Sequence, residues 1–195
     1  MAKRTGKLSD YRGKRDLAAS GEPAGGKRRG RRRPRFVVQE HQASSLHYDF
    51  RLEAGGTLKS WAIPKGPTAD PAEKRLAMPT EDHPLEYEDF EGVIPEGEYG
   101  AGEVIVWDKG TYDNRSRDRD GHELSVAEAI RHGHVSVVLR GKKLRGGYSL
   151  TRMRRGGRQA WLLVKKADEF AGGDPVKTSP ESVRSGKTVD QLRDG

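Results

Sequence analysis

The residue types best suited to chemistry stand together in the segment His47-Tyr48-Asp49-Phe50-Arg51-Leu52. In an extended strand, residues two apart point to the same side, so His47, Asp49 and Arg51 share one face. The residues between them share the other face and can enter a core. An imidazole, a carboxylate and a guanidinium in a row are the groups needed for two metal ligands and a phosphate clamp. We interpret this face as a candidate metal and phosphate site, although a lone His-x-Asp pattern more often contains an ordinary structural histidine.

His41 can join His47 on one ion only if the chain bends between them. Six residues of straight strand span about 20 Å, which is too far. Residues 42 to 45 have a turn-tolerant composition, so a bend there is credible. Two histidines and an aspartate suit manganese, zinc, cobalt or iron(II), and they do not choose among these metals. The chain contains no cysteine, which excludes thiolate metal sites and disulfides.

A second cluster of polar residues runs from Glu81 to Tyr87. Pro84 favours an extended conformation at His83, which could protonate a leaving oxygen or bind a phosphate oxygen. Glu81 could orient the His83 ring, and Tyr87 could donate a hydroxyl hydrogen bond. The alternative is an acidic surface loop that ends at a proline. Two further cations are possible phosphate contacts, although each is individually better explained as an ordinary surface charge: Lys65 and Arg75.

The positive charge of the chain is concentrated at its N-terminal end. The net charge is +8, but residues 1 to 35 hold 13 Lys and Arg against 3 acids, so the remainder is slightly acidic. This pattern is typical of a flexible tether to a polyanion. An acidic stretch from 81 to 103 and a basic stretch from 140 to 166 also fit nucleic-acid handling, although either could be a solvated face. Without a signal peptide or a long apolar run, we expect a soluble, cytoplasmic protein.

Short runs rich in β-branched and aromatic residues, bounded by Gly or Pro, predict a mainly β domain. Six or more strands in one small domain indicate a barrel or a sandwich. One helix is expected from 125 to 131, where Ser125 and Glu128 form a capping box. The strands are expected at 35–40, 58–63, 102–107, 135–139, 147–152 and 160–165.

We expect three regions along the chain. Residues 1 to 35 form a basic N-terminal arm, with a short helix between Leu8 and Leu17 and a mobile linker from 20 to 34. Residues 36 to 168 form the β domain. Residues 169 to 195 form a polar tail or interdomain linker, in which 182 to 194 could begin a helix that belongs to another domain.

Several motifs in the same order resemble the 3′-phosphoesterase module of bacterial DNA ligase D, from about Leu8 to Lys166. The basic run from 27 to 35 departs from the family pattern and leaves the role of the arm open. The motifs that carry the resemblance are Phe36 to His41, His47 to Leu52, Ser60 to Pro67, Glu81 to Tyr87 and Gly92 to Gly102, with Lys14-Arg15-Asp16 and Glu22-Pro23 upstream.

The resemblance implies a compact β-barrel with short flanking helices, a flexible basic arm and one manganese ion, with cobalt or zinc as possible substitutes. It implies an enzyme that removes a 3′-terminal ribonucleoside from a primer strand and then removes the remaining 3′-phosphate. Arg51 would neutralise developing charge and His83 would be the general acid. By motif, the metal ligands would be His41, His47 and Asp49; the phosphate contacts Arg51, Arg75, His83 and Tyr87; the supporting residue Glu81; and the diesterase residues Arg15, Asp16 and Glu22.

The implied partners are primer-template DNA 3′ ends, and ligase and polymerase domains in the same or a partner chain. We expect a monomer that acts at the bacterial nucleoid without contacting membranes. The tail from 180 to 195 resembles the linker that precedes a ligase domain. Two alternatives stay open from the residues alone: an iron(II) oxygenase built on His-x-Asp, which lacks a clear distal histidine, and a non-catalytic DNA-end-binding module.

Overall fold

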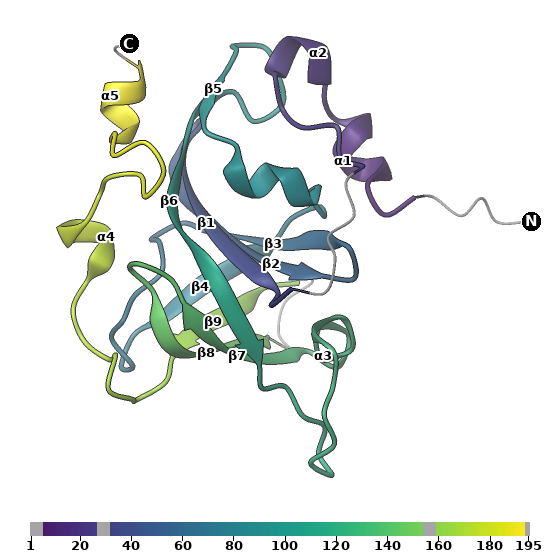
Figure 1. The fold of residues 1–195 in the computed structure, drawn as a ribbon, viewed down its shortest axis with the longest axis vertical. Coiled ribbons are helices and arrows are strands. Elements are labelled where there is room, and N and C mark those ends of the chain that lie inside the picture. The colour runs from purple at the N-terminus through teal and green to yellow at the C-terminus, as the bar shows by residue number, and fades with distance from the viewer. Residues whose placement is uncertain (1–5, 27–31, 154–158, 194–195) are drawn as a thin grey trace, which may run out of the picture.

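The computed structural model describes residues 6–26, 32–153 and 159–193. Within these residues a nine-stranded antiparallel sheet curls until β1 meets β6, so that all strands except β5 form a closed barrel (Figure 1). The short β5 (Gly92–Ile94) pairs with the beginning of β6. The barrel strands, in spatial order, are β1 (Arg35–Gln42), β2 (Leu46–Ala54), β3 (Thr57–Ile63), β4 (Lys74–Pro79), β9 (Trp161–Lys165), β8 (Arg145–Arg152), β7 (His134–Arg140) and β6 (Gly102–Asn114).

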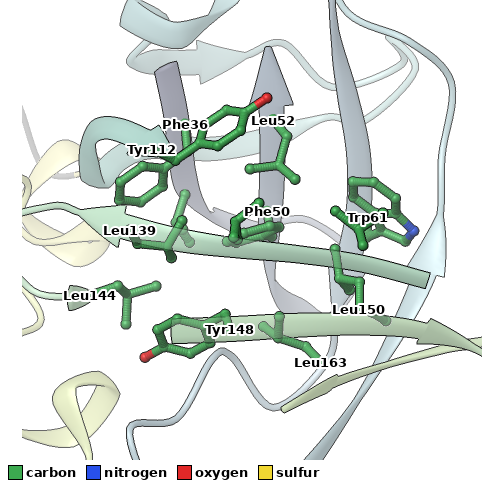
Figure 2. Packing of buried hydrophobic residues seen from close by; sticks show 14 of the residues in the cluster. Phe36, Phe50, Leu52, Trp61, Tyr112, Leu139, Leu144, Tyr148, Leu150 and Leu163 are labelled. Atoms are coloured by element: carbon green, nitrogen blue, oxygen red, sulfur yellow. The ribbon is translucent and has the colours of Figure 1, made fainter. Parts of the chain in front are cut away.

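The interior of the barrel is the main hydrophobic core. As the alternation on β2 predicts, Tyr48, Phe50 and Leu52 point inward and are at most 3% exposed. They meet aromatic and aliphatic side chains from the other strands, as Figure 2 shows for a selection of the cluster. Trp61 and Trp161 contact each other edge to face, with ring centroids 5.8 Å apart. The polar residues of β2 must therefore lie on the outer face of the barrel.

A second, smaller apolar cluster lies on that outer face. It joins Tyr11 of α1 (Ser9–Gly13) to Leu85 and Tyr87 of the 3-10 helix η1 (Leu85–Asp89), over Val37 and Val106 of the barrel wall. Burial of these side chains draws α1 and η1 onto the wall beside the polar residues of β1 and β2. The short helices therefore form the walls of a pocket over the outer face of the sheet.

The closed sheet confirms the barrel and excludes the sandwich. All six expected strands are present. The sequence pattern missed β4 and β5, because β4 has few β-branched residues and ends at a proline, and β5 spans three residues. The expected helix is α3 (Val126–His132), where Ser125 and Glu128 form the expected capping box. No helix in the described part of the chain is both long and apolar enough to cross a membrane.

The N-terminal region differs from the expected helix and mobile linker. Two short helices replace one, because the Asp16 carboxylate accepts hydrogen bonds from the N–H groups of Ala18 and Ala19 and caps α2 (Leu17–Ser20). Ser20 and Glu22 are buried, so the expected linker is packed on the barrel at these positions. Residues 27 to 31 of the predicted linker lie outside the described residues.

The C-terminal region also packs on the barrel, through α4 (Pro175–Thr178) and α5 (Val189–Arg193). The Trp107 indole N–H donates to the Ser179 carbonyl at 2.9 Å, and the Val183 N–H donates to the Val106 carbonyl at 2.9 Å. Val189 is 6% exposed. The helix expected between 182 and 194 is α5. Its segment contacts the barrel, which corrects the expectation that this helix belongs to another domain.

Candidate metal and phosphate site

The bend that His41 needs is a β-hairpin turn between β1 and β2. His41 and His47 are direct cross-strand partners, and their ring centroids lie 4.8 Å apart. The His41 Nδ1 and the His47 Nε2 each lie 3.7 Å from an oxygen of Asp49. Ligand atoms bound to one divalent ion at about 2.1 Å stand roughly 3 to 3.5 Å apart, so small movements would bring these atoms onto one ion. The three donors fit a metal site.

Backbone carbonyls set the orientation of both histidine rings. The His41 Nε2 lies 2.8 Å from the Gly100 carbonyl, and the His47 Nδ1 lies 3.0 Å from the Ser45 carbonyl. Because a carbonyl can only accept, these nitrogens carry the protons. The ring nitrogens that face Asp49 are then unprotonated, and each has the free lone pair that metal ligation requires.

Asp49 is ionised in this environment. Its burial alone would raise its pKa, but the Arg51 guanidinium holds the pKa well below its usual range. The Arg51 Nη2 donates to the Asp49 Oδ2 at 3.0 Å. An ionised carboxylate between two imidazoles is a hard, anionic donor, which suits a divalent cation.

Arg51 is fixed before any substrate arrives. Its side chain is buried, its Nε donates to the Gln39 Oε1 at 2.8 Å, and its Nη1 donates to the Ser60 Oγ at 2.9 Å. The guanidinium also lies over the Tyr87 ring, 4.9 Å from the centroid. A cation held this firmly can stabilise a phosphate without reorganising.

His83 lies between the two arginines of the site. Its Nδ1 is 2.9 Å from the Glu81 carbonyl and 3.0 Å from the Arg51 Nη1, and its Nε2 is 3.4 Å from the Arg15 Nη2. Burial, together with the charges of Arg51 and Arg15, holds the pKa of His83 well below its ordinary value. The ring is therefore neutral near pH 7 when no anion is bound.

Arg15 ties the N-terminal helices to the site. It donates to Glu22 at 2.9 Å and to Glu81 at 2.8 Å, and the Tyr87 hydroxyl donates to Glu22 at 2.9 Å. The Glu81 carboxylate also accepts from Lys14 at 3.2 Å. The Glu81 backbone carbonyl thus gives the expected support to His83. The Glu81 carboxylate instead binds Lys14 and Arg15 of the N-terminal arm.

Nearly all of the residues singled out in the sequence line one pocket of about 250 Å³. Asp16 is absent from its lining, because it is exposed and caps α2. Arg75 is also absent, since it lies on β4 opposite Leu163 and forms an ion pair with Glu73. Lys65 is exposed and likewise outside. The residues that line the pocket as expected are Arg15, Glu22, His41, His47, Asp49, Arg51, Glu81, His83 and Tyr87.

Sequence reasoning missed the residues that hold Arg51 and one aromatic residue at the rim. Gln39 lies two residues before His41 on β1 and opposite Asp49, so strand alternation could have placed it on the same face. Nothing in the sequence pairs Ser60 with Arg51. Tyr99 is 48% exposed at the rim, and its ring centroid lies 4.9 Å from the Arg15 guanidinium.

The family described as "DNA Ligase D 3'-phosphoesterase domain" matches residues 39–152. The "Multifunctional non-homologous end joining protein LigD" of Pseudomonas aeruginosa is 49% identical over 189 residues, which cover 93% of this chain and 22% of that protein. The protein of the same name in Mycolicibacterium smegmatis is 42% identical over 164 residues, 84% of this chain and 21% of that protein. The chain thus spans about a fifth of the length of these relatives.

Proposed function

Because the chain belongs to the DNA ligase D 3′-phosphoesterase family, we propose that it is a metal-dependent enzyme that processes DNA 3′ ends. In this proposal it removes a 3′-terminal ribonucleoside to leave a 3′-phosphate, and then removes that phosphate to expose a 3′-hydroxyl for ligation. The observation that carries the proposal is the meeting of three metal donors and two arginines, Arg15 and Arg51, in one pocket.

The metal is held by His41, His47 and Asp49 in this proposal. A bound ion would act as a Lewis acid toward a phosphate oxygen. Manganese is the first choice, by family resemblance. Cobalt and zinc fit the same donors, because two imidazoles and a carboxylate do not discriminate strongly among these metals.

The arginines receive the phosphate. Arg51 is buried, and three side chains hold its guanidinium nitrogens, so its charge is already in place when negative charge develops. Arg15 lines the same pocket. Two guanidinium groups around one phosphate offset its charge as the ester bond breaks.

His83 gives the leaving oxygen its proton. The ring is neutral in the free protein, because burial and the two arginines disfavour its charged form. An incoming phosphate anion offsets the arginine charges, so the pKa of His83 rises and the ring can take up a proton. A water molecule attacks the phosphorus, and as the phosphorus–oxygen ester bond breaks the protonated imidazole donates its proton to the departing oxygen.

The diesterase step depends most on the N-terminal helices. Arg15 and Glu22 line the pocket, and Glu22 also holds the Tyr87 hydroxyl. Asp16 does not line the pocket, so it contributes by capping α2 and thereby placing Arg15 and Glu22. The phosphomonoesterase step relies mainly on the metal donors, Arg51 and His83.

The larger setting follows from the relatives, which are multifunctional end-joining proteins by name. We propose that ligase and polymerase domains accompany this domain in the same chain or in a partner, at primer-template ends on the bacterial nucleoid. The domain itself acts as a monomer, since one chain carries the complete pocket.

The test is a 5′-labelled primer with one 3′-terminal ribonucleotide, annealed to a template and incubated with manganese, cobalt or zinc. We expect a 3′-phosphate product to appear first and a 3′-hydroxyl product to follow. Arg15→Ala should slow the first step more than the second, whereas Arg12→Ala, which removes an exposed arginine of α1 outside the pocket lining, should slow neither. If the primer stays intact with every metal, the proposed function is wrong.

A further inference from the structure

Two adjoining hollows on the barrel wall beside α3 are lined by positively charged side chains. One contains Lys59, Arg131 and Arg152, and the other contains Arg117, Arg119 and Arg152. Because Arg152 lines both, the two hollows adjoin each other. We call the pair the α3 groove and define it by Lys59, Arg117, Arg119, Arg131, His134 and Arg152.

The α3 groove begins at the edge of the metal and phosphate site. Thr80 lines both the site pocket and the nearer hollow. Its N–H donates to the Ser60 carbonyl at 3.0 Å, and the Ser60 hydroxyl accepts from Arg51 within the site. A long ligand with one end in the pocket can therefore continue into the groove without leaving the protein surface.

The charge in the groove is mostly uncompensated. Among the described residues, Arg119, Arg131 and Arg152 form no ion pair, while Lys59 pairs with Asp82. The second pair joins Arg117 to Glu123, and both side chains are more than half exposed, so solvent screens that pair.

One further acid lines the groove, and its own loop already holds it. The Asp118 carboxylate accepts from the N–H groups of Asp120 and His122 and from the His122 ring. Asp118 keeps its negative charge, so the two acids that line the groove, Asp82 and Asp118, offset only part of the charge of its five lysine and arginine side chains. The groove presents a positive surface, the type that attracts a polyanion.

The aromatic residues of the groove favour double-stranded over single-stranded nucleic acid. Proteins that bind single strands stack bases on exposed aromatic rings. The only aromatic residues lining the described part of the groove besides histidines are Trp61 and Trp161, which are 2% and 3% exposed. Cations without a stacking platform suit the phosphate backbone of a duplex, whose bases are paired and stacked on each other.

We propose that the α3 groove binds the phosphate backbone of the duplex that leads away from the 3′ end held in the site. This inference rests on the proposed function for the position of the 3′ end, and it adds the surface that selects a primer-template over a free strand. The contacts are independent of sequence, because phosphates carry no base identity.

The test compares the Arg119→Gln/Arg131→Gln variant with an Arg184→Gln/Lys187→Gln control. The control removes the same charge from the C-terminal segment, which lies across the barrel from α3 in Figure 1. Binding of a labelled primer-template duplex is measured by fluorescence anisotropy at several salt concentrations. For the groove variant we expect roughly tenfold weaker binding and a salt slope reduced by about 1.8, or about 0.9 for each lost phosphate contact.

The proposal is overturned if the groove variant binds the duplex like wild type, or if the control weakens binding equally. It is also overturned if only single-strand binding weakens. Steady-state kinetics also test whether the groove binds the duplex. The groove variant should have an about tenfold higher KM for the duplex with little change in kcat. Its ratio of kcat/KM for the duplex to kcat/KM for a trinucleotide should fall.

The duplex-binding and phosphoesterase measurements distinguish an error in the groove proposal from an error in the proposed function. If wild type shows no phosphoesterase activity but the groove variant alone loses duplex binding, the surface is supported and the enzyme assignment is wrong. If wild type is active and the groove variant keeps its duplex affinity and salt slope, the enzyme assignment stands and the groove proposal is wrong.

Discussion

Replacing Tyr11 with alanine should release the N-terminal helices while leaving the barrel folded. Tyr11 is fully buried, its ring packs edge to face on Tyr87 with centroids 6.0 Å apart, and the Arg15 guanidinium lies 4.3 Å from its centroid. Its hydroxyl donates to the Pro23 carbonyl at 2.8 Å. Removal of a buried aromatic side chain costs about 3 to 5 kcal/mol, and removal of the hydroxyl alone costs about 1 kcal/mol.

The lost free energy should lower the stability of the N-terminal helices against local opening and leave the barrel unaffected, because Tyr11 belongs to the outer apolar cluster and not to the barrel interior. Hydrogen exchange measured by mass spectrometry should show amides of residues 9 to 20 exchanging roughly 150- to 5,000-fold faster in Tyr11→Ala, up to the unprotected rate. Tyr11→Phe should accelerate them only about fivefold.

In both variants the amides of β7 and β8 should keep their protection, since their side chains pack in the interior cluster. The diesterase rate should fall with the protection of the arm, because Arg15 and Glu22 then leave the pocket. The reasoning is refuted if β7 and β8 lose protection as much as the arm does, or if Tyr11→Ala leaves the arm amides protected.

Three further predictions concern charges and the C-terminal segment. Asp49→Ala should lower Tm by roughly 6 to 20 °C in the absence of metal, because it leaves Arg51 buried without its carboxylate at a cost of about 3 to 5 kcal/mol; a change under 2 °C by calorimetry would contradict this. Burial raises the pKa of Glu81, but Arg15 and Lys14 outweigh it and the pKa is lowered. The stabilisation that the ionised Glu81 carboxylate gives through these ion pairs is therefore fully present above about pH 4.3, the pKa of an unfolded glutamate. It is lost as the pH falls through the lower pKa of Glu81 in the folded protein. Limited proteolysis of the arm should accelerate only in that acidic range, and equal cleavage from pH 3 to 7 would count against the ion pairs. Trp107→Phe should cost more than about 1 kcal/mol, because it removes the indole N–H and also leaves a cavity in the barrel interior, and urea unfolding that shows no loss would mean that the C-terminal contact is not stabilising.

The sequence predicts the barrel and the metal cluster because both depend on local alternation. A two-residue period assigns His47, Asp49 and Arg51 to one face, and turn-forming residues after His41 are enough to bring the two histidines together. These inferences require only strand geometry and one tight turn.

The packing of the arm could not be predicted, because it depends on single residues in a basic, glycine-rich background. No sequence pattern around Tyr11 or Glu22 indicates what they contact. Only the folded structure shows that Tyr11 packs on Tyr87 and that Glu22 binds Tyr87 and Arg15. Motif order also does not say where on a closed barrel a side chain lies, and Arg75 lies outside the lining of the site pocket.

The most direct test of the central claim is the manganese dependence of 3′-phosphate release from a primer-template by wild type, His47→Ala and His132→Ala. His132 is an exposed histidine of α3 that lies outside the site pocket and outside both groups of possible metal ligands in the described residues, so it serves as the matched control. Wild type and His132→Ala should release phosphate with the same manganese dependence and bind the same number of manganese ions by titration. His47→Ala should lose both the bound ion and the activity while keeping its barrel circular dichroism spectrum. Full phosphate release by folded His47→Ala would contradict the account.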